Sequence, residues 1–356
     1  MHRAAIAWFV LALSLACQAR EPADGDTLAD TSDDEVSASD STSSEDESSS
    51  STTTDDESST TTESSTTDES ESSTTGESDS TEGDATGDEW LAECPSVADP
   101  TMQATIGFTE LGEASGMVHS RSQDLLWAHN DSGDSPRIFA FGLDGQRIAT
   151  LELPGVLALD WEDLAIGPGP GPGDWLYAGD IGDNAKIRPW ITIVRVPEPL
   201  DVARLGVDPI VADDIGTIDL TYPDGPHDAE ALMIDPITGD LYIVSKAADT
   251  QLFRRPAPIT NGELEELPMP NFPSAIATAS DISAKGDFIA VRGYSDAFGW
   301  IRALDQSVGE AMLGEPCELP LAAEMQGEIF AFESTGAGYF TLSEGTNPPL
   351  WWYAYQ

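Results

Sequence analysis

Short apolar runs separated by turn residues recur along the chain from about residue 94 to its last residue. The turns between the runs have the chemistry of β-hairpins, as in DPITGD, AKGD and STGAG. No long segment places its apolar residues at the 3.6-residue period of a helix. This pattern predicts an all-β domain.

Five segments of this region share one order of elements: a polar start, an apolar run, a turn, a second run, a polar loop and a third run. They start at Glu113, Trp161, His227, Ser280 and Gln326. A repeat of about 50 to 65 residues built from short strands is typical of the blades of a β-propeller. The stretches RIATLEL, GTIDLTY, LEELPMP and CELPL follow the first four segments and are candidate outer strands. We expect about five four-stranded blades.

Six blades are the alternative, because the segment between Asn184 and Tyr222 is long enough to contain extra structure. The fifth segment reaches Gln356 without an outer strand of its own. A strand-like stretch from Met102 to Phe108 precedes the first segment, and we predict that it completes the last blade and closes the ring.

The N-terminal sequence resembles that of an exported lipoprotein. Residues 1–16 have a short basic start and the apolar run AAIAWFVLALSLA, which is too short to span a bilayer. The following Cys17 completes LSLAC, which resembles a bacterial lipobox. We expect Cys17 to be lipidated and to anchor the protein to the bacterial cell envelope, at the outer membrane or cell surface. Cleavage after Ala16 and release as a soluble protein is the alternative.

Residues 17–93 are predicted to form a disordered tether, and residues 94–356 are predicted to form the propeller. The tether is almost entirely Ser, Thr, Asp and Glu, so it cannot bury enough apolar surface to fold. An acidic interaction tail is the alternative. The whole chain has 65 acidic and 15 basic residues and a net charge of −50. Nucleic acid is therefore excluded as a partner, whereas divalent cations are attracted.

Three cysteines occur in the chain. With Cys17 assigned to a lipid, Cys94 and Cys317 remain as a pair in an oxidising compartment, and we predict a disulfide between them. Closure of the ring by an N-terminal strand would place both near the seam between the last two blades. Two free cysteines are the alternative.

Acidic residues recur where the first strand of a segment begins. In a propeller the first strand lines the central channel and the second returns to the same face, so residues at these two points become neighbours. Carboxylates that converge there repel one another unless they are neutralised, and Ca²⁺ accepts six to eight oxygen ligands. We predict a Ca²⁺ site formed by Glu162, Glu230, Asp281 and Glu328. Carboxylates that bind backbone N–H groups or face a water-filled channel are the alternative.

Polar residues gather near the ends of the same strands. The residues predicted to face a ligand are His129, Asn130, Asp131, Asp180, Asp183, Asn184, His227, Asp228, Lys246, Arg292 and Glu344. The two histidines are interpreted as structural rather than as general bases. Tryptophans that could stack on sugars, but that strand patterns usually bury, are Trp127, Trp161, Trp175, Trp300, Trp351 and Trp352.

The common catalytic signatures are absent from the sequence. It contains no Gly-x-Ser-x-Gly, no His-Glu-x-x-His and no Walker motif. The stretch GPGPGPGD is no phosphate loop, because its prolines lack N–H donors. No catalytic residue is predicted.

The phrases WAHNDSGDSPRIFAFGLDG, DWEDLAIG, LYAGDIGDN, YPDGPHDAEALMIDPITGDLYIVSK and QGEIFAF resemble exported bacterial β-propeller lipoproteins. These are similar in blade pattern to phytase-like and calcium-dependent apyrase propellers. The resemblance implies that metal ions held by channel acids bridge to phosphate, a role that would fall to Glu162, Glu230 and Glu328. Those enzymes also present Lys and Arg to phosphate, for which this chain has only scattered candidates: Lys186, Arg188, Lys246 and Arg292.

Three functions follow as expectations. The first is a surface-anchored module that displays a calcium-binding propeller to an unidentified protein, glycan or small molecule. The second is a calcium-dependent phosphohydrolase, and the third is a glycan-binding propeller. Fold alone does not decide among them.

Overall fold

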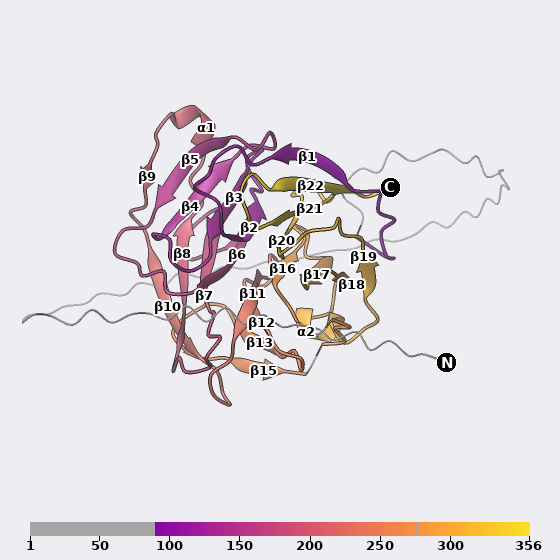
Figure 1. Ribbon diagram of the computed structural model, residues 1–356. Coiled ribbons are helices and arrows are strands. Elements are labelled where there is room, and N and C mark those ends of the chain that lie inside the picture. Colours follow the sequence, from indigo (N-terminus) through magenta and orange to yellow (C-terminus); the bar gives the residue numbers. More distant parts are fainter. Residues whose placement is uncertain (1–89, 269, 275) are drawn as a thin grey trace, which may run out of the picture. The chain divides into compact units, whose positions relative to one another are not determined.

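Five β-sheets are arranged as a ring in the computed structural model, which describes residues 90–268, 270–274 and 276–356. The innermost strands of the sheets surround a common centre, and the other strands lie outside them (Figure 1). The fold is therefore the predicted five-bladed propeller. The predicted signal peptide, Cys17 and nearly all of the predicted tether lie outside the described residues.

Each blade is antiparallel apart from two short parallel strands at the outer edges of the first two blades. Blade 1 contains β2 (Ala114–His119), β3 (Leu126–Asn130), β4 (Arg137–Phe141), β5 (Arg147–Glu152) and β9 (Ile210–Val211). Blade 2 contains β6 (Trp161–Pro168), β7 (Asp174–Asp180), β8 (Ile191–Pro197), β10 (Gly216–Thr221) and β14 (Gly262–Glu263). Blade 3 contains β11 (Ala229–Ile234), β12 (Leu241–Ser245), β13 (Leu252–Arg255) and β15 (Glu265–Leu267).

The last two blades follow the same plan. Blade 4 contains β16 (Ala279–Ile282), β17 (Phe288–Arg292), β18 (Ala297–Ile301) and β19 (Cys317–Leu319). Blade 5 contains β20 (Gly327–Phe332), β21 (Gly338–Ser343), β22 (Pro349–Ala354) and β1 (Thr101–Thr105). The four outer strands predicted from the sequence correspond to β5, β10, β15 and β19, so all four are confirmed.

The ring is closed by the N-terminal strand. Strand β1 pairs antiparallel with β22, which confirms the predicted closure, although β1 ends at Thr105 rather than at Phe108. A disulfide joins Cys94 to Cys317 of β19, as predicted, and their Cα atoms are 5.7 Å apart. The disulfide thus links the chain just before the closing strand of blade 5 to the outer strand of blade 4.

The segment that left room for a sixth blade instead extends two existing ones. It contains β8 and β10 of blade 2, the short helix α1 (Val202–Leu205) and β9. Strand β9 pairs parallel with β5 and so adds a fifth strand to blade 1. The segment therefore passes from blade 2 to the edge of blade 1 and back.

The hydrophobic core consists of layers between neighbouring blades. Among the described residues, buried apolar side chains form five clusters, one at each junction of adjacent blades. A blade inside the ring is covered on both faces, so its inner strands read as continuous apolar runs, and every residue of β2, β3, β11 and β12 is buried. The outer strand β10 alternates buried and exposed positions instead.

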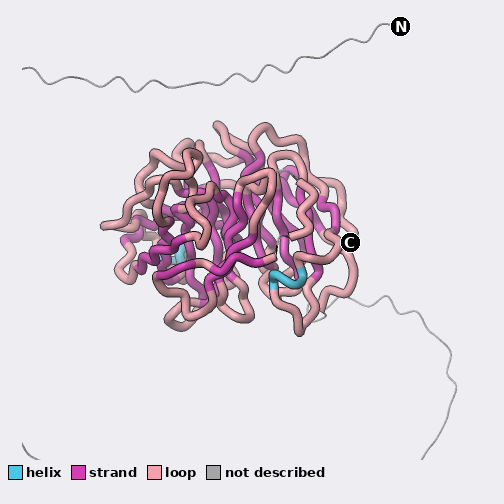
Figure 2. The backbone as a smooth tube through the Cα atoms, turned by 90° about the horizontal axis from the view of Figure 1, so that it is seen from below, coloured by secondary structure: helices cyan, strands magenta, loops and turns pink. Residues whose placement is uncertain are grey.

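The two short helices lie at the periphery of the molecule, among the loops (Figure 2). The second, α2 (Val308–Ala311), begins with a capping box formed by Ser307 and Glu310. No helix in the described part of the chain is long and apolar enough to cross a membrane.

Candidate functional site

The starts of the innermost strands and the ends of the second strands meet on one face of the propeller. In every blade the first residue of the innermost strand pairs with the last residue of the second strand. The pairs are Ala114 with Asn130, Trp161 with Asp180, Ala229 with Ser245, Ala279 with Arg292 and Gly327 with Ser343. We call this end of the channel the channel mouth. Its position follows from the strand topology that the sequence predicted.

A β-bulge interrupts four of the five innermost strands just inside the channel mouth. The register of β11 shifts between Ala229 and Ala231, which leaves Glu230 as the extra residue, and β20 shifts in the same way at Glu328. In β6 the shift spans Glu162 and Asp163, and in β2 it falls at Ser115. A bulge bends its strand and redirects a side chain, so it explains why a glutamate recurs at this point of three blades.

Three carboxylates form the tightest acidic group at the mouth, which we call the acid triad: Asp131, Asp160 and Glu162. One oxygen of each lies within 4.8 Å of the others. Gly182 makes room for them, because a Cβ at this position would overlap carboxylate oxygens of Glu162 and Asp160. Asp160 precedes β6 and Asp131 follows β3, so the acid triad joins blades 1 and 2.

Burial and like charge both act on the acid triad. Burial first, and then the negative charges of Glu230, Asp131 and Asp160, raise the pKa of Glu162 to about 11. Burial and the charge of Asp131 likewise raise the pKa of Asp160 to about 6. The protein thus gathers acidic groups whose ionised forms are mutually unfavourable unless a cation joins them.

Glu230 extends the acidic group into blade 3. Its Oε1 forms an ion pair with Lys246, which follows β12. Its Oε2 is buried and has no hydrogen-bond partner among the described residues. Burial raises the pKa of Glu230 to about 7 even though Lys246 opposes the shift. A buried carboxylate oxygen without a donor is uncommon and indicates a missing partner.

Glu328 continues the series into blade 5. Burial, and then a hydrogen bond shared with Glu344, raise the pKa of Glu328 to about 9. Two carboxyl groups can share a hydrogen bond only if one of them keeps its proton. The negative charge of Glu230 also contributes to this shift, so the three predicted glutamates act on one another electrostatically.

The structure places Asp281, the fourth predicted metal ligand, in a different environment. Its two oxygens accept the backbone N–H groups of Ile282 and Phe332. Asp163 accepts three backbone N–H groups. One comes from Leu164, the next residue of β6, and the other two come from Leu232 of blade 3 and Ser280 of blade 4. These two aspartates hold innermost strands together.

Asp163 has a structural role that the sequence analysis did not identify. It is 1% exposed and lies inside the channel directly after Glu162. Its signal was present in the motif DWEDLAIG, where a charged residue enters an apolar strand that is buried on both faces. Such a residue must find hydrogen-bond partners inside the protein.

Several residues predicted to face a ligand instead hold loops in place. His129 is fully buried, with Nδ1 at 2.9 Å from Asn130 O, and Asn130 bonds to Glu113 N, Glu110 O and Asp134. His227 contacts Asp224 at 2.7 Å and packs against Tyr222 and Phe253. Among the predicted ligand-facing group, Asp131 belongs to the acid triad and Asn184 is exposed.

The aspartates after β7 and before β11 form a hydrogen-bonded layer around the acid triad. Asp180 accepts the backbone N–H groups of Leu159 and Asp160. Asp183 accepts the N–H of Arg188, and its own N–H donates to Asp228. This layer fixes the loops that carry Asp160 and Gly182.

The predicted phosphate-binding cations are mostly paired with carboxylates. Arg292 is fully buried and its Nη1 lies 3.0 Å from Glu324. Arg188 pairs with Asp180 at 2.7 Å, and Lys246 pairs with Glu230. Lys186 is exposed, on the loop after β7. The mouth therefore contains more acidic than basic side chains, and most of these basic side chains are already paired.

The tryptophans divide by exposure. Trp127, Trp161, Trp175 and Trp300 are buried in the layers between blades, and Trp351 and Trp352 are partly buried. The exposed one among the described residues is Trp190, at 53%, which sequence reasoning did not select. Trp190 directly precedes β8, outside the strand pattern, so the sequence did not indicate whether its indole is buried or exposed.

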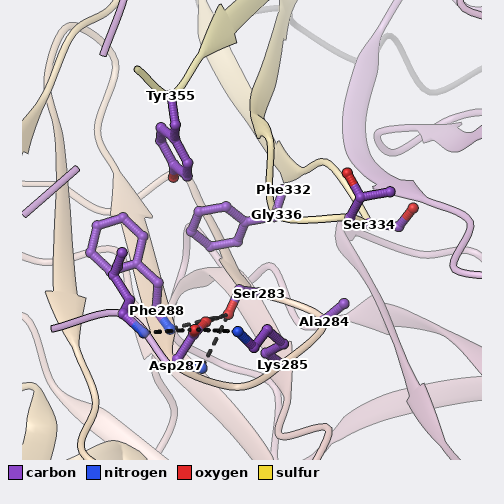
Figure 3. A pocket seen from close by; sticks show the side chains of 11 residues that line it. Ser283, Ala284, Lys285, Asp287, Phe288, Phe332, Ser334, Gly336 and Tyr355 are labelled. Atoms are coloured by element: carbon purple, nitrogen blue, oxygen red, sulfur yellow. Dashed lines mark hydrogen bonds and ion pairs between the residues drawn. The ribbon is translucent and has the colours of Figure 1, made fainter. Parts of the chain in front are cut away.

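A small cavity lies at the far end of the channel axis, between blades 4 and 5. Its volume is about 130 Å³, and Phe288, Phe332 and Tyr355 form its apolar wall (Figure 3). On its polar side the carboxylate of Asp287 accepts from the hydroxyl of Ser283 and pairs with Lys285 at 3.8 Å. This cavity has room for one ring-sized apolar group. It borders the ends of β16 and β20 opposite the channel mouth and shares no residue with the acid triad.

Comparison with known proteins adds no identification. No protein family model matches the sequence, and no curated protein is detectably similar to it. The chemistry of the mouth must therefore be argued from its own residues. Hard oxygen ligands from three blades, in a partly buried setting with irregular spacing, suit a divalent cation of the Ca²⁺ type.

Proposed function

We propose that the protein is a surface-anchored binding module whose propeller holds Ca²⁺ at the channel mouth. The observation that carries the proposal is the acid triad together with the unpartnered Oε2 of Glu230. A cation between them would neutralise the like charges that raise the pKa of Glu162 and would give Glu230 the partner it lacks. The anchor at Cys17 rests on the sequence alone.

Calcium fits this donor set better than the common transition metals do. All the converging groups are carboxylates, and neither cysteine nor an accessible histidine joins them, because His129 is buried against Trp161. The ligands also come from loops and bulges of different blades, which favours a cation that tolerates irregular geometry. Backbone carbonyls and water would complete the coordination.

A calcium-dependent phosphohydrolase is the weaker candidate. Metal-bridged phosphate hydrolysis needs positive groups that face the phosphate oxygens. Arg188, Lys246 and Arg292 are already engaged with carboxylates. The arrangement therefore favours binding over turnover.

The test is the stability of the purified protein in chelator and then in excess Ca²⁺ or Mg²⁺. Ca²⁺ at a hundredfold excess over its dissociation constant should raise the free energy of unfolding by about 2.7 kcal/mol. Asp160→Asn combined with Glu162→Gln should abolish the rise. Glu318→Gln, an exposed glutamate on the outer strand β19, is the matched control and should leave it unchanged. No Ca²⁺-dependent rise in the unaltered protein would refute the cation site.

A further inference from the structure

A groove on blade 2 lies beside the acid triad but is built from other side chains. It has a volume of about 460 Å³, which lies within the usual range for small-molecule sites. The segment that connects blade 1 to β6 forms one wall, and the loop before β8 forms another. Its inner end is Asp180, which also binds the N–H of Asp160. We call it the Trp190 groove.

The apolar part of the lining of the Trp190 groove is unusually exposed. Trp190 is 53% exposed, Leu157 73% and Leu159 60%. Exposed apolar side chains are ordinary when scattered, but here they line one concave surface. A planar indole open on one side offers a stacking platform for a ring with an apolar face.

The rest of the groove lining carries hydrogen-bonding groups. Thr192 on β8 donates to Oδ1 of Asp219 on β10 at 3.0 Å, and the two residues are cross-strand partners. Thr217 lies on the same strand as Asp219 and also lines the groove. At the inner end, Arg188 is fixed by Gly182 O at 2.8 Å and by Asp180. Hydroxyls, carboxylates and a guanidinium thus line the same groove as the exposed indole.

This combination selects among possible occupants. Asp180 and Asp219 outnumber the single guanidinium, which is already paired, so an anionic ligand would be repelled. A wholly apolar partner would strip water from the polar wall without replacing its hydrogen bonds, which is unfavourable for each group. A pyranose has an apolar C–H face for the indole and hydroxyl edges for the threonines and Asp219.

We infer that the Trp190 groove binds neutral carbohydrate, with Trp190 stacked on a sugar ring and Asp219 accepting from its hydroxyls. The site is separate from the proposed cation site, because none of the acid triad lines the groove. Sugar binding should consequently persist when Ca²⁺ is removed. The outcome therefore tests the groove independently of the cation.

The experiment is calorimetric titration of the purified full chain in chelator with a panel of neutral oligosaccharides: β-1,4-glucans, β-1,4-N-acetylglucosamine oligomers, α-1,4-glucans and α-mannans. At least one should bind in the millimolar range or tighter. Trp190→Ala should weaken that binding roughly tenfold, and Trp190→Phe should weaken it less because an aromatic face remains. Asp219→Ala should weaken it without changing the unfolding midpoint.

Ile187→Ala is the matched control. Ile187 is an exposed apolar residue on the same loop, at 75%, but does not line the groove, so its replacement should leave sugar binding unchanged. The inference is overturned if no oligosaccharide of the panel binds, or if Trp190→Ala binds the sugar as tightly as the unaltered protein. Trp190-dependent binding of nucleosides or apolar peptides, with no sugar bound, would also overturn it.

Discussion

Two sets of carboxylates, buried or half-buried, line the same channel, and they differ in what they contact. Inside the channel, Asp163 and Asp281 accept backbone N–H groups from neighbouring blades. At the mouth, Glu162 and Glu328 have other carboxylates as their chief charged neighbours, and Glu230 is paired with Lys246 as well as being acted on by further carboxylates. Burial raises the pKa of groups in both sets. The next largest cause separates them, because backbone N–H groups oppose the shift at Asp163 and Asp281, whereas carboxylates increase it at Glu162 and Glu328. At Glu230 the pairing with Lys246 opposes the shift.

The comparison shows that burial of an acid does not by itself indicate a ligand. Asp163 is as deeply buried as any residue of the mouth, yet its oxygens are satisfied by the protein. Glu230 keeps one oxygen without a donor. The number of donors that reach a carboxylate is therefore the better guide to whether it holds the fold or awaits a cation.

Removal of Asp163 should have the largest effect on stability. Asp163→Ala leaves the N–H groups of Leu232 and Ser280 buried without an acceptor. We expect the free energy of unfolding to fall by about 3 to 5 kcal/mol in chelator and in Ca²⁺ alike. Chemical denaturation would measure it. A loss that Ca²⁺ restores would contradict the structural role and remove the distinction between the two sets.

Lys246→Met should have an intermediate effect: it should lower the stability of the metal-free protein and raise its affinity for Ca²⁺. Without Ca²⁺, loss of the ion pair with Glu230 should cost about 2 kcal/mol, limited because Glu230 can take up a proton. With Lys246 gone, Oε1 of Glu230 as well as Oε2 is free to join the cation, so Ca²⁺ affinity should rise. Calorimetric titration would detect the change, and a weaker affinity would place Lys246 among the groups that support the site.

The pH dependence of stability should report the ionisation of the three glutamates at the channel mouth, Glu162, Glu230 and Glu328. The pKa values of Glu230, Glu328 and Glu162 in the folded protein are about 7, 9 and 11, above the ordinary value of 4.5. The unfolded chain therefore releases protons that the folded protein keeps. Metal-free stability should fall as pH rises from about 5 toward 9, by about 1.4 kcal/mol per pH unit for each acid still protonated in the fold.

Denaturation in urea between pH 5 and pH 9 would measure this slope. The triple change of these glutamates to glutamine should flatten it, and saturating Ca²⁺ should reduce it because the ion binds the deprotonated groups. Stability that stays constant across this window in metal-free protein would show that these glutamates ionise as freely in the folded protein as in the unfolded chain.

Glu162→Gln alone should have the smallest effect. Because the pKa of Glu162 is raised to about 11, the carboxyl keeps its proton at neutral pH in metal-free protein, and glutamine has the same shape. The free energy of unfolding in chelator should change by less than about 0.5 kcal/mol at pH 4, where the unfolded chain also keeps this proton, and at higher pH the variant should be the more stable protein because glutamine releases no proton on unfolding. A large loss in the same denaturation measurement would mean that Glu162, like Asp163, holds the fold.

The sequence was informative about the fold because the repeat and the hairpin turns are local. It predicted five blades, the outer strands, ring closure by residues near Met102 and the Cys94–Cys317 disulfide, all of which the structure confirms. It also aligned Glu162, Glu230 and Glu328, because each occupies the same position in its blade. The bulges that turn these side chains toward the mouth depend on strand pairing and were not visible in the residues.

The remaining contacts at the mouth depend on tertiary structure. Asp160 precedes its strand and reaches Asp131 of another blade only once the ring has formed. Asp281 follows the periodic pattern but meets the amide of Phe332 from the next blade. Exposure of Trp190 depends on the loop before β8, where no periodicity applies. The sequence was thus least informative about side chains whose contacts come from two different blades.

The disulfide that precedes the closing strand has a mechanical consequence. Tension applied to the chain ahead of Trp90 reaches Cys94 before it reaches β1, and there it passes through a covalent bond into β19 of blade 4. The hydrogen bonds between β1 and β22 are thereby spared the load. A propeller held by its N-terminal end can be pulled without its ring being peeled open, as long as Cys94 and Cys317 stay oxidised.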